Sequence, residues 1–264
     1  MRVLSKIGLA LALVTMSSAA GFAADIIEEP PLMEPEVIIA AGGWYLRGDL
    51  GMSNQQLHGG LSNELFDTVD TLEFLDEGHF SSAPTFQVGI GYQLNEWMRF
   101  DATAQYRGKS DFSALDRYEF LDDNNPATWD AANEYSAKKS EWLLLANAYV
   151  DMGTFSGITP YVGAGIGMSR NTISDFRDIN TVNNGVAYAP GNSEWSFAWA
   201  LHTGLAMDVT DRVALDLGYS YVNLGDASSG DIVTFNGTNS VDNPMHFDEI
   251  TSHDLKFGLR YKLN

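Results

Sequence analysis

The sequence predicts an all-β fold: an eight-stranded antiparallel transmembrane β-barrel in which consecutive strands run up and down. Three observations favour it. Apolar and polar residues alternate in eight segments, the connections between them are alternately short and long, and after residue 23 no apolar run approaches the about 20 residues of a spanning helix. A barrel strand alternates because one face meets lipid and the other faces the lumen.

Each alternating segment is long enough to cross a membrane as a tilted strand. A strand of about 10 residues rises roughly 33 Å, and a tilt near 40° projects this rise to about 25 Å, the height of the apolar band in such barrels. In one segment Phe86, Val88 and Ile90 share a face while Gln87 and Gly89 share the other. The eight segments are residues 43–53, 83–94, 98–108, 139–152, 159–170, 194–209, 212–223 and 251–263.

Two segments carry unusual residues on the face expected to point inward. Leu143 and Leu145 lie on that face, so we expect them to pack against neighbours. Gly163, Gly165 and Gly167 also lie there, although glycine is costly inside a strand. In a narrow barrel such glycines make room for long inward side chains from opposite strands.

The connections predict which end of the barrel faces which compartment. Outer-membrane barrels have short periplasmic turns and long extracellular loops. Residues 43–264 are therefore expected to form one barrel domain with four long extracellular loops. The short turns are expected near residues 95–97, 153–158 and 210–211. The long loops are expected at about 54–82, 109–138, 171–193 and 224–250.

The N-terminus predicts export. Arg2 and Lys6 precede an apolar run of ten residues from Ile7 to Met16, and small residues lead to Ala23. This order is typical of a signal peptide, so residues 1–23 are expected to be removed. Residues 24–42 are acidic and rich in proline, and we expect them to form an extended periplasmic leader.

The charge balance excludes some partners. The chain has 15 Lys and Arg against 35 Asp and Glu, a formal net charge of -20, so nucleic acid would be repelled. It has no cysteine, which rules out disulfides and thiolate metal sites. No metal site and no cofactor site are predicted.

The inward faces predict a polar network with a structural role. Eight strands leave an interior just wide enough for side chains, and an unpaired buried charge costs several kcal/mol. We therefore expect the inward charges to pair into a packed interior with no open pore, or only a narrow one. The residues expected in this lumenal network are Arg47, Asp49, Arg99, Asp101, Arg107, Glu141, Asp151, His202, Asp208, Asp216, Asp254, Lys256 and Arg260.

Three stretches resemble a known family. Residues 159–167 (TPYVGAGIG), 216–221 (DLGYSY) and 257–262 (FGLRYK) are similar to small outer-membrane barrels of the opacity and OmpA-like transmembrane type, and to alpha-proteobacterial porin-like surface antigens. The resemblance implies a Gram-negative outer-membrane location, contact with membrane lipid and lipopolysaccharide, and roles in envelope integrity and surface-loop presentation to host or surface ligands. It also implies recognition of the C-terminal strand by the barrel-assembly machinery. That family usually ends in an aromatic residue, whereas this chain ends Leu263-Asn264, so recognition would fall on Tyr261 and Leu263.

Catalysis is not predicted. Lipid-hydrolysing barrels need a nucleophile oriented by a base. His202 shares a strand face with Ser196, but six residues of strand separate them by roughly 20 Å. We expect His202 to be a lumenal hydrogen-bonding residue and the chain not to be an enzyme.

Two other functions stay open at this stage. A narrow porin for small solutes would differ from a closed barrel by its conductance. A soluble lipocalin-like periplasmic carrier would need apolar residues lining a cavity and polar residues outside.

Overall fold

In the computed structural model, residues 42–119, 129–182, 184–238 and 243–263 are described. The predicted signal peptide and all but the last residue of the predicted leader lie outside these ranges. The described residues form antiparallel strands and one short 3-10 helix, η1 (Glu64–Thr68). The strands are β1 (Gly43–Ser62), β2 (Thr71–Phe80), β3 (Ala83–Gln93), β4 (Met98–Glu119), β5 (Ala131–Asp151), β6 (Ile158–Asn180), β7 (Val186–Ala189), β8 (Asn192–Asp208), β9 (Val213–Asp231), β10 (Val233–Thr234) and β11 (Pro244–Lys262).

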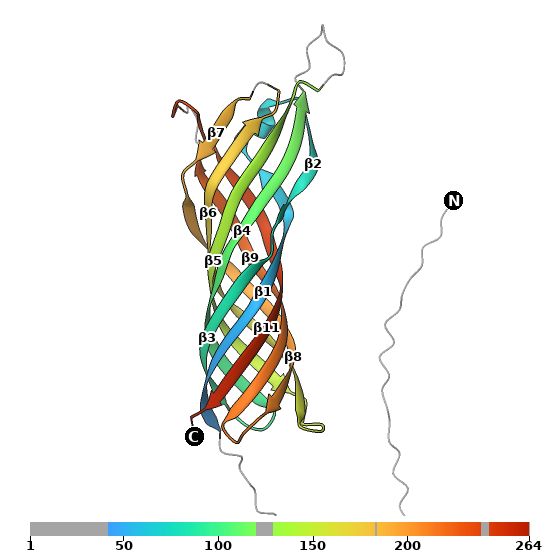
Figure 1. Ribbon diagram of the computed structural model, residues 1–264, viewed down its shortest axis with the longest axis vertical. Helices are drawn as coiled ribbons and strands as arrows, with labels where there is room; N and C mark the ends of the chain where they lie inside the picture. The colour runs from blue at the N-terminus through green and yellow to red at the C-terminus, as the bar shows by residue number, and fades with distance from the viewer. Residues whose placement is uncertain (1–41, 120–128, 183, 239–242, 264) are drawn as a thin grey trace, which may run out of the picture. The chain divides into compact units, whose positions relative to one another are not determined.

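The strands form one sheet that closes on itself. Pairing runs from β1 through β3, β4, β5, β6, β8, β9 and β11, and β11 pairs with β1 again. All of these pairings are antiparallel, so the all-β antiparallel class is confirmed (Figure 1). The strand number differs from the expected eight. The described residues contain eleven strands, because β2, β7 and β10 pair outside this circuit.

The two ends of the sheet differ. The predicted short turns join β3 to β4, β5 to β6 and β8 to β9, and two of them are closed by backbone hydrogen bonds from Leu94 to Met98 and from Val209 to Val213. This turn end also carries the C-terminus, whereas β2 and β7 lie at the opposite end (Figure 1).

Much of the sequence expected to form long loops is strand. The sheet continues through parts of 54–82, 109–138, 171–193 and 224–250, and we call these four stretches the extension. In the extension the faces exchange roles: on β4, Phe112 and Ala114 are buried inside while Lys109 and Asp111 are exposed outside. A lipid-facing strand shows alternating apolar residues on its outer face, whereas here the outer face is polar, so the sequence predicted loops.

An apolar core fills the inside of the extension and continues into the adjoining part of the spanning strands. The Phe112 ring lies 4.9 Å from that of Phe80 and 5.0 Å from that of Phe247, between ring centroids. Leu143 and Leu145 join the same core, which confirms that they pack against neighbours. The other buried members are Ala114, Tyr135, Ala137, Ile173, Phe176, Ala189, Ala198, Ala200, Val222, Leu224, Ala227, Ile232, Met245 and Ile250.

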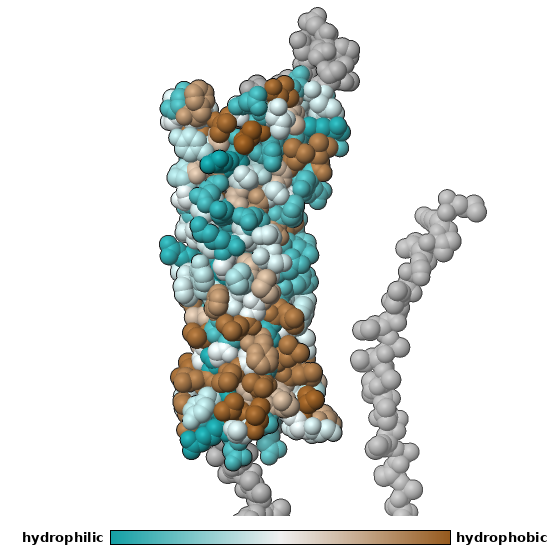
Figure 2. All heavy atoms as spheres, viewed as in Figure 1, coloured by the Kyte–Doolittle hydropathy of each residue, from teal (hydrophilic) through white to brown (hydrophobic). Residues whose placement is uncertain are grey.

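Between the extension and the turn end, the outer surface is apolar instead. Figure 2 shows these side chains gathered in a band over the half of the sheet nearest the C-terminus. The described residues contain no helix long and apolar enough to cross a bilayer. Exposed members of the band include Leu46, Leu50, Val88, Ile90, Phe100, Leu144, Val162, Ile166, Phe197, Leu201, Leu217, Leu255, Phe257 and Leu259.

Inward glycines make room for large side chains, but on the paired strand rather than the opposite one. Gly163 pairs with Tyr149, and a Cβ there would come within 2.4 Å of the Tyr149 ring. Gly91 pairs with Tyr45, and its Cβ would come within 2.2 Å of that ring. Each glycine thus lets a neighbouring tyrosine fold over the sheet into the interior.

Truncating Phe247 should destabilise the extension strongly. Phe247→Ala removes a fully buried ring from the apolar core, which costs about 3–5 kcal/mol. Phe235→Ala is the matched control, because Phe235 is 78% exposed and should change stability by less than about 0.5 kcal/mol. Urea unfolding in detergent micelles, followed by tryptophan fluorescence, measures both. Equal midpoints for the two variants would contradict a packed core.

Candidate functional site

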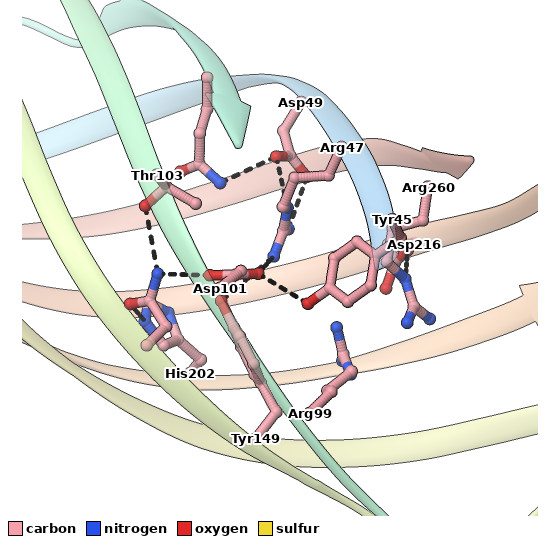
Figure 3. Close-up of polar contacts among 12 residues, drawn as sticks. Tyr45, Arg47, Asp49, Arg99, Asp101, Thr103, Tyr149, His202, Asp216 and Arg260 are labelled. Carbon is pink, nitrogen blue, oxygen red and sulfur yellow. Dashed lines mark hydrogen bonds and ion pairs between the residues drawn. The ribbon is translucent and has the colours of Figure 1, made fainter. Parts of the chain in front are cut away.

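The inside of the spanning part of the sheet holds an ionic network, beside the part of the apolar core that Leu143 and Leu145 form. On β1, Arg47 donates from Nε and Nη2 to the two carboxylate oxygens of Asp49, at 2.9 Å and 2.7 Å. Its Nη1 donates to Asp101 Oδ2 on β4 at 2.9 Å (Figure 3). Arg47 therefore links two carboxylates on strands that are not hydrogen-bonded to each other, and it closes the interior at this level.

Neutral side chains complete the bonding of Asp101. The Tyr45 hydroxyl donates to its Oδ2 at 3.1 Å, and Asn147 Nδ2 donates to its Oδ1 at 2.7 Å (Figure 3). The Oδ1 of Asn147 lies 3.1 Å from His202 Nε2, and His202 Nδ1 lies 2.8 Å from Ser220 Oγ. His202 thus belongs to this hydrogen-bonded layer.

A second ionic layer lies closer to the extension. Arg107 donates from Nη1 and Nη2 to the two carboxylate oxygens of Asp254, at 3.1 Å and 2.7 Å. Its Nε lies 3.5 Å from Glu141 Oε1, and Lys139 Nζ donates to Glu141 Oε2 at 2.6 Å. These four side chains are buried. A bidentate, fully buried arrangement of this kind is the strong form of an ion pair.

Lys139 and its partner Gln55 belong to this layer but were not among the residues predicted for the lumenal network. Gln55 accepts from Lys139 Nζ at 3.0 Å and donates to Glu141 Oε1 at 2.9 Å. The signal for Lys139 was present, because it begins a predicted segment and stands two residues before the inward Glu141. Gln55 falls in a stretch expected to be a loop, so its inward position was not visible.

A further ion pair lies nearer the turn end. Arg99 Nε donates to Asp151 Oδ1 at 3.1 Å, and its guanidinium carbon lies 4.3 Å from the Tyr149 ring centroid and 4.5 Å from that of Tyr161. Stacking on two aromatic faces stabilises a cation beyond its ion pair.

The remaining sequence-predicted residues divide into buried and exposed. Arg260 Nε donates to Asp216 Oδ2 at 2.7 Å, and Lys256 Nζ lies 3.5 Å from Gln87 Oε1. Asp208 is outside the network, because it is exposed and pairs with Lys262 at 3.1 Å. Asp208 ends β8 at the rim of the sheet, where it lines the open mouth of the interior and is therefore reached by water.

Little empty space remains inside the network. A cavity of about 10 Å³ lies among Arg47, Tyr149, His202 and Lys256. That is about the minimum volume for a single water molecule. Nearer the turn end the interior opens into a polar mouth of about 450 Å³, lined by Tyr45, Asp151, Arg260 and others.

A serine, a histidine and an aspartate meet on the outer surface of the extension, although the sequence indicated no compact cluster of this type. His79 Nε2 lies 3.3 Å from Ser113 Oγ, and His79 Nδ1 lies 3.4 Å from Asp76 Oδ2. The His79 side chain is 68% exposed and that of Asp76 is 44% exposed. Water competes for both groups, so the cluster lacks the shielding that activates a nucleophile. The absence of catalysis stays a prediction.

Comparison with known proteins places the chain in a family. Residues 9–262 match the family described as "Outer membrane protein beta-barrel domain". The chain belongs to this family, and it is an outer-membrane protein that lies in the lipid membrane.

Relatives cover most of the chain. An uncharacterized protein of Brucella suis is 33% identical over 270 residues, 95% of each chain. Outer membrane protein PagN of Salmonella typhimurium is 26% identical over 72% of this chain and 77% of its own, and a putative adhesin of Rickettsia bellii is 25% identical over 83% and 88%. Among solved structures, Neisserial surface protein A has a TM-score of 0.45 at 17% identity, covering 84% of this chain and 99% of its own.

Breaking the second ionic layer should cost far more than breaking an exposed pair. Arg107→Ala removes the cation that pairs with the buried carboxylate of Asp254, and one of the two that flank Glu141, which costs about 3–5 kcal/mol. Arg117→Ala is the control, because the Arg117–Glu73 pair is partly exposed and worth at most about 1 kcal/mol. Urea midpoints in detergent micelles measure both. Small and similar decreases of the urea midpoint in both variants would show that water reaches Arg107, and would contradict a buried ion pair.

Asp178 should make stability fall as the pH rises. Burial in the extension, followed by the charge of Asp116, raises the pKa of Asp178 to about 7. The folded chain keeps this proton up to about pH 7, whereas the unfolded chain releases it near the ordinary pKa of an aspartate, 3.8. The contribution of Asp178 is therefore fully present below about pH 4 and is lost as the pH rises to about 7.

The matching experiment compares Asp178→Asn with the wild type. The urea midpoint of the variant should rise relative to the wild type between pH 4 and pH 7.5, and the difference should level off above that range. Asp175→Asn is the control, since the Asp175 side chain is 61% exposed. A constant difference between wild type and Asp178→Asn across this range would refute the assignment.

Proposed function

We propose that the chain is a closed, non-catalytic, eight-stranded membrane barrel that maintains the envelope and presents a structured surface outside the cell. The spanning strands are the eight of the circuit, β1, β3, β4, β5, β6, β8, β9 and β11. The turn end faces the periplasm and the extension projects outward, as short and long connections do in such barrels.

One observation carries this proposal: the interior is filled in two different ways along its length. Ionic layers around Arg47 and Arg107 occupy the part inside the apolar band, and the core around Phe112 and Phe247 occupies the extension. An ion crossing this path would have to displace paired charges and then enter an apolar plug, and both steps carry a large desolvation cost. A narrow porin is therefore the weaker candidate.

The lipocalin-like carrier also fits poorly. A soluble carrier needs a polar exterior around an apolar cavity. Here the band has exposed Leu50, Val88 and Phe257 outside and Arg47 and Asp101 inside. The extension does have an apolar interior, but the protein's own side chains fill it.

The outer surface of the extension suits presentation to other surfaces. Its strands hold a defined shape beyond the membrane, and relatives named an outer membrane protein and a putative adhesin match most of the chain. We propose host or environmental surface ligands as its partners. We also propose that the signal peptide is cleaved after Ala23. The assembly machinery would recognise β11 through Tyr261 and through Leu263, which follows the strand; both side chains are exposed.

Purified protein in planar bilayers should show no steady conductance. The expected trace is flat at voltages that open a reference porin added afterwards to the same membrane. The reference porin controls for bilayer quality, and heat-modifiable gel mobility of the sample controls for folding. Uniform, long-lived current steps from folded wild-type protein would contradict the closed interior and favour the porin.

A further inference from the structure

Among the described residues, cations outside the buried interior are scarce and, apart from two at the turn end, lie on one part of the wall. Six of the Lys and Arg side chains among the described residues are buried inside. Of the others, Arg212 and Lys262 lie at the turn end. The rest all lie on three consecutive strands, β4, β5 and β6, and they are Lys109, Arg117, Lys138, Arg170 and Arg177.

Arg170 stands at the upper edge of the apolar band between two tryptophans. On the outer face it pairs across the strands with Trp142 of β5 and with Trp195 of β8, whose side chains are 50% and 51% exposed. Arg170 is exposed, and no described carboxylate lies within ion-pair distance of it. At a membrane interface, the long arginine stem lies along apolar surface while the guanidinium reaches the headgroup layer.

Two more cations lie just beyond this edge. A β-bulge between Arg107 and Ser110 sets Lys109 on the outer face, where it is exposed. One step further, Lys138 faces Asp111 across the strands and lies 3.7 Å from Asp175. The three cations of this cluster, Arg170, Lys109 and Lys138, thus outnumber its two carboxylates, in a chain whose net charge is -20.

Directly below the cations, the apolar band is hollowed. Ala102 and Ala104 of β4 and Ala146 of β5 lie among larger outward side chains, so the surface sinks at these positions. The hollow is shallow and open to the outside. Its rim is formed by Leu46, Val88, Ile90, Leu144, Ile166 and Met168.

We propose that this face binds one lipopolysaccharide molecule of the outer leaflet. An acyl chain of lipid A occupies the hollow, and its phosphates lie against Arg170, Lys109 and Lys138. This rests on the proposed function, because it requires the extension to face outward. Arginine offers a fork of donors to a phosphate, and lysine offers a point charge.

Lipopolysaccharide fits this face better than a phospholipid does. The cations are spread over three strands, and neighbouring strands lie about 4.8 Å apart, so the cluster can meet two separate phosphates. Lipid A carries two phosphates on one headgroup, whereas a phospholipid such as phosphatidylglycerol carries one. Other strands lack the charge: beyond the band β1 presents Asn54 and Gln56, and β11 presents His253.

Native mass spectrometry of the folded full chain in detergent tests the proposal. The probes are diphosphoryl lipid A, dephosphorylated lipid A and phosphatidylglycerol. Wild type should hold one diphosphoryl lipid A, at least ten-fold tighter than either other lipid. Arg170→Gln combined with Lys109→Gln should weaken lipid A binding at least ten-fold, and Ala146→Phe, which fills the hollow, should weaken it as well.

Matched control variants distinguish this site from nonspecific lipid binding elsewhere on the protein. Arg212→Gln with Lys262→Gln removes two cations at the turn end, and Leu217→Phe enlarges an outward residue on β9, so both variants should bind as wild type. Equal affinity for phosphatidylglycerol, or unchanged lipid A binding by the Arg170 and Lys109 variant, would overturn the proposal. Heat-modifiable gel mobility and recovery in outer-membrane fractions test whether the chain is a membrane barrel at all. Failure of the proposed function can therefore be distinguished from failure of the lipopolysaccharide site.

Discussion

The constraint on which this structure depends is that one closed sheet meets two different solvents along its length. Inside the band, lipid outside requires apolar outward side chains, so the polar ones point inward and must satisfy each other. In the extension, water outside allows polar outward side chains, so the inward ones form an ordinary apolar core around Phe112 and Phe247. The exchange occurs where the strands leave the band, and on β4 it coincides with the bulge between Arg107 and Ser110.

The inward charges are held by geometry as much as by sequence. Arg47, Asp101 and Arg107 find partners on other strands because glycine stands opposite many large inward residues. Gly258, for example, pairs with Asp49, and a Cβ there would come within 2.1 Å of the Asp49 carboxylate. An interior packed in this way leaves little free volume between Arg47 and Lys256, which suits the closed barrel proposed above.

The sequence predicted the spanning part well and the extension poorly, for a physical reason. Alternation with a lipid-facing side identified the antiparallel class, the short turns and the inward set that includes Arg47 and Glu141. Alternation did not predict which inward residues form ion pairs with one another, because these pairs depend on the strand register and on closure of the barrel. The extension was read as loops because residues such as Phe80, Tyr135 and Phe176 are spaced irregularly by bulges and positive-φ positions such as Gly78 and Asp175. Lys139 and Gln55, which lie where the spanning segments meet the extension, were not predicted as inward residues for the same reason.

The exchange of faces along β4 can be measured directly, because the chain has no cysteine and accepts single spin labels. Labels would replace Ala102, Ala104, Lys109 and Asp111 in turn, in protein folded into lipid bilayers. We predict that the first two collide with oxygen dissolved in the lipid, and that the last two collide with a water-soluble nickel complex. Oxygen contact at all four positions, or nickel contact at all four, would contradict a single sheet that passes from lipid into water.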